Sequence, residues 1–90
     1  MPELNPVDYQ TLPLEALTVT DLTDALGVLK SADLLETSAR AIYTIRNTNV
    51  LSTQRILKLI DAVRADEATC RQRLVIKRNM QKARRDKRGY

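Results

Sequence analysis

The sequence predicts an all-α fold, a helical hairpin or three-helix unit with a long C-terminal helix. All three prolines lie within the first thirteen residues, and after Pro13 the only glycines are Gly27 and Gly89. Little in the remainder of the chain therefore opposes helix formation. Apolar residues beyond Pro13 recur at intervals of three and four, the spacing of one helix face. The stretch from Ser52 to Arg85 has neither proline nor glycine, and as one helix it would be about 50 Å long.

Length and composition predict one domain with a small aliphatic core. A chain of 90 residues buries only part of its surface when it folds. It contains no tryptophan, no phenylalanine and three tyrosines, so leucine, isoleucine, valine and alanine must fill the core. Such a core is marginal for a chain of this size, and this favours stabilisation by a partner chain.

The beginning of the chain, residues 1–17, is expected to be an extended lead-in, because its prolines fix the main chain and remove backbone donors. A helix is expected to follow over residues 18–30. Thr18 and Asp21 suit its N-terminus, and leucines and alanines then recur at helical spacing. Gly27 would weaken this helix by about 1 kcal/mol relative to alanine.

A second helix is expected within residues 31–46. One continuous helix over 20–46 would let the apolar stripe rotate around the helix axis, since its average step is well short of 3.6 residues. We therefore expect a break near residues 31–33, with one continuous bent helix as the alternative. Asp33, followed by Glu36 three residues later, resembles a capping box that would restart the helix.

Two short segments also permit strands. Residues 40–48 and 73–78 are rich in the β-branched and aromatic side chains that are common in sheets. Pairing of these segments would give a small mixed fold, which stays an alternative to the all-helical prediction.

The long C-terminal helix carries an apolar seam with heptad-like spacing. Its members recur in steps of four and three, with Glu67 filling one gap, and they are Ile56, Ile60, Val63, Cys70 and Leu74. A seam of this length favours a packed helix over an extended coiled coil. We expect these residues to form a helix-packing interface with the body, with another copy of the chain or with a partner protein.

Charge is divided unevenly along the chain. Residues 1–70 contain six basic and ten acidic residues, a net charge of −4, whereas residues 71–90 contain nine basic residues and one acid, a net charge of +8. We therefore expect the lead-in to be followed by a helical body over 18–70 and a basic helix or arm over 71–90. Such an arm suits an acidic partner. The residues expected to contact it are Arg71, Arg73, Lys77, Arg78, Lys82, Arg84, Arg85, Lys87 and Arg88.

Composition argues against catalysis and against metal or cofactor binding. Without histidine, the chain lacks the side chain best suited to acid–base chemistry near neutral pH, and it has no glycine-rich phosphate loop. Cys70 is the only cysteine, so an internal disulfide and a cysteine–histidine zinc site are excluded. We expect no catalytic residue, cofactor, metal or small-molecule substrate.

The same features bear on location. A single cysteine favours a reducing compartment, and no apolar run reaches the roughly 20 residues of a membrane span. We therefore expect an intracellular protein of the cytoplasm or of the nucleus or nucleoid.

The segment LTVTDLTDALGV, residues 17–28, resembles the first half of a repressor-type helix-turn-helix. That resemblance implies a following recognition helix that packs on the first and presents polar side chains to DNA bases. At two positions where the second helix would face inward, this chain has Asp33 and Glu36, whose burial without partners would be costly. A variant with residues 38–46 as the recognition helix lacks the preceding glycine turn.

Two functional hypotheses follow. The first is a small non-enzymatic interaction protein that oligomerises or docks on a partner protein through its long C-terminal helix. Its basic arm would contact an acidic partner, with nucleic acid as the first candidate, mainly through phosphates and with little sequence selectivity. The alternative is a DNA-binding regulator with a degenerate helix-turn-helix.

Overall fold

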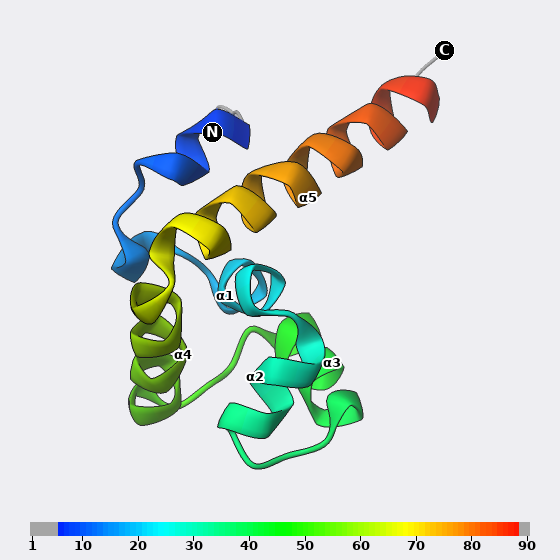
Figure 1. Cartoon of the computed structure of the whole chain (residues 1–90). Coiled ribbons are helices and arrows are strands. Elements are labelled where there is room, and N and C mark those ends of the chain that lie inside the picture. Colours follow the sequence, from blue (N-terminus) through cyan, green and yellow to red (C-terminus); the bar gives the residue numbers. More distant parts are fainter. Residues whose placement is uncertain (1–5, 89–90) are drawn as a thin grey trace.

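The computed structural model describes residues 6–88, and this part of the chain is helical with no strand (Figure 1). The predicted all-α fold is confirmed, and the strand alternative for residues 40–48 and 73–78 is wrong. Two 3-10 helices, η1 (Pro6–Gln10) and η2 (Leu14–Ala16), precede the α-helices. These are α1 (Val19–Leu26), α2 (Val28–Leu34), α3 (Ala39–Thr48), α4 (Thr53–Ala65) and α5 (Glu67–Arg88).

Helix α1 is the centre of the fold and is buried almost all round. It packs against each of the four other α-helices, and every residue from Asp21 to Leu26 is buried. Its N-terminus is held by a capping box, in which the Thr18 hydroxyl accepts a hydrogen bond from the Asp21 amide and the Asp21 carboxylate accepts one from the Thr18 amide, both at 3.1 Å. The predicted role of Thr18 as N-cap is confirmed.

Gly27 ends α1 rather than weakening a longer helix. Its φ of 90° lies in a region that side chains with a Cβ rarely adopt. The expected break near residues 31–33 is therefore wrong, because the chain turns four residues earlier. Ser31 instead lies inside α2, fully buried, where its hydroxyl donates to the Gly27 carbonyl at 2.8 Å.

The turn between α2 and α3 is a Schellman motif without glycine. The Thr37 amide donates to the Ala32 carbonyl at 2.9 Å and the Glu36 amide to the Asp33 carbonyl at 3.2 Å, while Glu36 adopts a φ of 54°. The predicted capping box of Asp33 and Glu36 is wrong, since Asp33 belongs to the end of α2. Ser38 caps α3 instead, through its hydroxyl and the Ala41 amide.

The predicted continuous helix from residue 52 onward is also wrong, because α4 ends at Ala65 and the chain changes direction at Asp66 (Figure 1). Asp66 has a φ of −142° and a ψ of 53°, and neither proline nor glycine causes the break. Helices α4 and α5 both pack against α1. Bending the chain between them lets both halves of the apolar seam reach that one helix, whereas a straight helix would carry its outer half away from the body.

The lead-in is not extended where the structure describes it. The prolines at positions 6 and 13 stand at or just before the two 3-10 helices, consistent with the fixed φ of proline. Leu14 and Leu17 are buried in the common core, and η1 packs along α5. The lead-in thus packs on the C-terminal helix on the side opposite α1 (Figure 1).

Replacing Glu36 by glycine is expected to raise the free energy of unfolding by about 0.5–1 kcal/mol. Glycine adopts a positive φ without crowding between a Cβ and the following carbonyl, and Glu36 now bears that cost. Urea unfolding followed by circular dichroism measures the change. Glu36→Ala is the matched control, because it removes the carboxylate but keeps the Cβ, and it should bring no gain. Equal stabilisation by both variants would contradict the backbone explanation.

Candidate functional site

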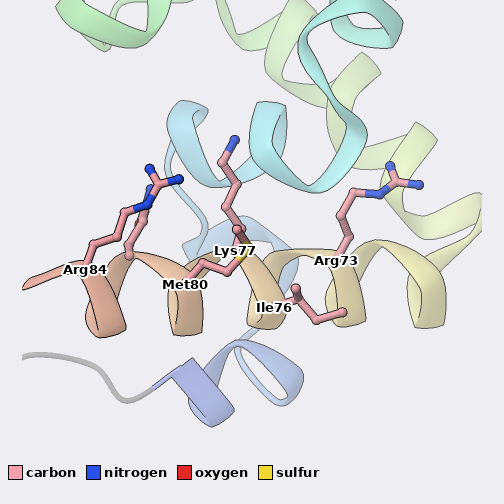
Figure 2. Close-up of a pocket in the computed structure, with 6 residues that line it drawn as sticks. Arg73, Ile76, Lys77, Met80 and Arg84 are labelled. Carbon is pink, nitrogen blue, oxygen red and sulfur yellow. The ribbon is translucent and has the colours of Figure 1, made fainter. Parts of the chain in front are cut away.

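Three basic residues of α5 share one flank of the helix. Arg73, Lys77 and Arg84 extend toward the side on which α1 lies (Figure 2). They line a shallow groove of about 330 Å³ together with Gln81 and two apolar side chains, Ile76 and Met80. Ile76 is 51% exposed and Met80 is 55% exposed. The flank therefore combines positive charge with accessible apolar surface.

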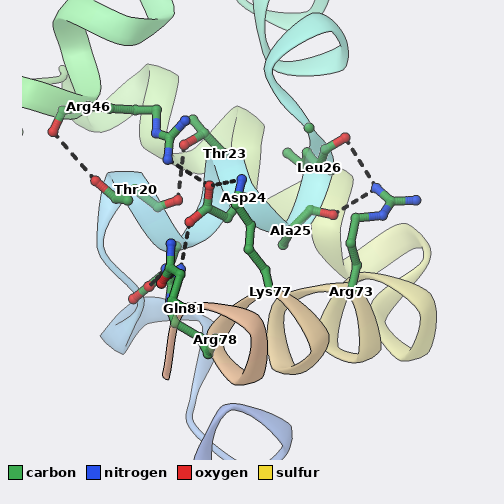
Figure 3. A network of polar contacts seen from close by, with 12 residues as sticks. Thr20, Thr23, Asp24, Ala25, Leu26, Arg46, Arg73, Lys77, Arg78 and Gln81 are labelled. Carbon is green, nitrogen blue, oxygen red and sulfur yellow. Dashed lines mark hydrogen bonds and ion pairs between the residues drawn. The ribbon is translucent and has the colours of Figure 1, made fainter. Parts of the chain in front are cut away.

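Two cations in the inner part of α5, Lys77 and Arg78, form ion pairs with one buried carboxylate, that of Asp24 (Figure 3). Its Oδ1 accepts from Arg46 Nη2 of α3 at 2.8 Å and lies 2.8 Å from Lys77 Nζ of α5. Its Oδ2 accepts from Arg78 Nη1 at 2.8 Å. The Asp24 side chain is 0% exposed, so these cations replace the water that a buried carboxylate loses.

Arg78 is the most engaged of these cations. It donates to the carboxylates of both Asp21 and Asp24, and its guanidinium lies 5.4 Å from the centre of the Tyr9 ring. Burial disfavours the charged form of Arg78, but the hydrogen bonds to the two carboxylates outweigh burial and raise the pKa of the guanidinium. Arg78 is thus a fixed structural charge between α1, η1 and α5.

Two further arginines bind backbone carbonyls. Arg73 Nη1 donates to the carbonyls of Ala25 and Leu26 at 2.9 and 3.2 Å, where the last turn of α1 leaves acceptors without helical partners. Arg71 Nη1 donates to the carbonyl of Tyr9 at 3.1 Å. Both arginines tie α5 to elements that are distant in sequence.

The outer part of α5 differs from the inner part. Lys82 and Arg84 are exposed, and within residues 6–88 no hydrogen bond or ion pair engages either side chain. Arg85, Lys87 and Arg88 continue the helix, but their side chains lie outside the described part of the structure. The nine predicted contact residues therefore divide into four that bind the body, two that are free and three whose side chains are not described.

The predicted packing residues lie together in the core. Ile60, Val63, Cys70 and Leu74 are buried, and Ile56 packs against them at the edge. The seam therefore packs within the chain itself, on both sides of the break at Asp66.

Cys70 is a buried thiol of that core. Burial is the largest influence on its pKa and raises it above the usual value, while the positive charge of Arg73 acts in the opposite direction. A raised thiol pKa lowers the fraction of reactive thiolate.

Sequence reasoning missed Asp21, Asp24 and Arg46 as partners of the basic run. A signal was present, because Asp24 lies among Leu22, Ala25 and Leu26 in a short apolar helix. An acid that is buried in such a helix needs a cation. The local sequence could not identify that cation, because Arg46 and Arg78 lie 22 and 54 residues from Asp24 along the chain.

The resemblance to a repressor helix-turn-helix is not reproduced by α1 and α2. Gly27 alone separates these helices, and Asp33 and Glu36 are exposed rather than inward-facing. The two acids therefore escape the burial penalty that the motif would have imposed.

Comparison with known proteins identifies no relative, because the chain matches no protein-family model, no curated protein and no solved structure. Within residues 6–88, no helix has both the length and the apolar character needed to cross a membrane.

Substituting Asp24 by asparagine is expected to lower the free energy of unfolding by about 3 kcal/mol. The change keeps the shape of the side chain but leaves the buried cations without their counter-charge. Urea denaturation gives the value. Asp61→Asn is the control, since its exposed carboxylate lies 3.9 Å from Arg64 and its loss should change stability by less than about 0.5 kcal/mol. Similar losses in both variants would show that the buried network is not a principal source of stability.

Proposed function

We propose that this chain is a non-enzymatic interaction protein that binds nucleic acid through the outer half of α5. The observation that carries the proposal is the change along this helix at Arg78. Up to that residue the cations are held by the body, and beyond it Lys82 and Arg84 are exposed without an acidic partner among the described residues. Unpaired cations along a rigid helix suit the regular negative charge of a phosphate backbone.

The fold supports this proposal by fixing the direction of the arm. Its final turns extend beyond the other helices (Figure 1), and three inner anchors, Arg71, Arg73 and Arg78, hold its base. A partner would therefore meet a preformed helix and would not have to order a flexible tail, which reduces the entropic cost of binding. The proposal includes an intracellular location, because the proposed partner is a nucleic acid.

Self-association through α5 is the second candidate function. Ile76 and Met80 leave accessible apolar surface on the groove flank, and a second copy could cover it. Arg73, Lys77 and Arg84 line the same flank, so two copies meeting there would bring like charges together. This repulsion favours an acidic partner over a second copy.

Replacing Lys82 and Arg84 together by alanine is expected to weaken nucleic-acid binding and to reduce its dependence on salt. Each lost phosphate contact lowers the slope of log K against log salt by about 1, so the double variant should lose about 2. Fluorescence anisotropy with a labelled duplex at several salt concentrations measures both quantities. Arg64→Ala is the control for loss of a surface cation outside α5, since Arg64 is exposed on α4 and paired with Glu15. Wild-type protein that binds neither duplex nor single strands at low salt would refute the proposal.

Sedimentation velocity separates the two candidates. Without nucleic acid, the protein is expected to remain monomeric, because the apolar seam is already buried within one chain and the remaining flank is positively charged. A stable dimer that dissociates on Ile76→Gln with Met80→Gln would instead establish self-association through α5. Leu57→Gln is a suitable control, because Leu57 is 50% exposed on α4.

A further inference from the structure

Helix α3 presents one continuous polar face. Arg40, Tyr43, Thr44 and Asn47 are exposed, and their spacing of three and four places them on one side of the helix. Ile42 is fully buried on the opposite side. The core thus holds this helix, while its outer face is free to meet a partner.

This face belongs to a stretch of the chain without acids. From residue 37 to residue 60 the sequence contains no aspartate or glutamate and four basic residues. Arg46 turns inward to Asp24, whereas Arg40, Arg55 and Lys58 are exposed, and no ion pair engages them within the described residues. Residues 1–36, by contrast, hold seven acids and one lysine. This stretch of positive charge is separate in sequence from α5, and within it Arg40 is the exposed cation of α3.

The backbone around α3 also has the form of a helix-turn-helix. Helix α2 ends at Leu34, residues 35–38 form the turn, and α3 begins at Ala39 and packs against α2. Motifs of this class join two helices by a turn of three or four residues that often contains glycine. Here Glu36 takes the left-handed conformation that glycine would supply.

We propose that α2 and α3 form a DNA-binding helix-turn-helix in which α3 reads base edges in the major groove of duplex DNA. This inference rests on the proposed nucleic-acid function and adds sequence recognition to the phosphate contacts of α5. Arg40 has the donors to pair with guanine O6 and N7, and Asn47 has the donor and acceptor to pair with adenine N6 and N7. The Tyr43 ring centre lies 5.8 Å from the Arg46 guanidinium.

Duplex DNA fits this face better than duplex RNA does. The major groove of B-form DNA admits an α-helix, whereas the major groove of A-form RNA is too narrow and deep for its bases to be read in that way.

The test begins with selection of preferred sequences from a random duplex DNA library by the wild-type protein. Binding of the selected duplex and of an unrelated duplex is then measured for Arg40→Ala and for Asn47→Ala. Each variant should lose about tenfold to a hundredfold in affinity for the selected duplex and much less for the unrelated one. Arg64→Ala is the control of equal charge for Arg40→Ala. The double variant Lys82→Ala with Arg84→Ala should weaken both duplexes by the same factor.

The outcomes separate this inference from the function on which it rests. Binding to DNA without an enriched sequence, or an enriched sequence whose preference survives both Arg40→Ala and Asn47→Ala, would overturn base reading by α3 and leave phosphate binding by α5 intact. Stronger binding to RNA or to single strands of the same sequence would do the same. Absence of any nucleic-acid binding would overturn both. Circular dichroism of each variant confirms the fold, which these exposed positions should not disturb.

Discussion

The structure depends on the pairing of one buried carboxylate. Asp24 lies in the central helix with no exposed side-chain surface, and cations from α3 and α5 surround it. A lone buried carboxylate would cost several kcal/mol, so α1 can occupy the centre only if these helices bring their positive charges to it. The aliphatic core supplies burial without much directional preference. The Asp24 network links α1 to α3 and to α5 through directional ion pairs.

This arrangement gives the basic run of α5 two roles. Its inner cations satisfy acceptors on α1 and η1 and hold the helix to the body. Its outer cations then extend from a rigid base. The structural and the proposed functional charges thus follow one another along a single helix, and the transition lies at Arg78. The same network supports the exposed polar face of α3, because Arg46 anchors that helix to Asp24.

Sequence reasoning succeeded where local signals were strong. The N-cap Thr18 follows from a side chain that bonds the first turn of a helix. The core members Ile60, Val63, Cys70 and Leu74 follow from helical spacing. It failed at the turns. Gly27 reads as a weak helix position but ends α1, and Glu36 carries no sign that it adopts a left-handed conformation. The candidate site was predicted as nine equivalent cations, because nothing local distinguishes Arg78 from Arg84.

The sequence by itself determined the helical class, the position of the apolar seam and the concentration of positive charge in the last twenty residues. These properties depend on composition and on short-range periodicity. Only the tertiary structure decided that the helix is interrupted at Asp66 and that four cations of α5 bind the rest of the fold. It also decided that α3 exposes a polar face. Each of these depends on contacts between residues far apart in the chain. The physical reason is that a buried charge must find its partner wherever the fold can bring one.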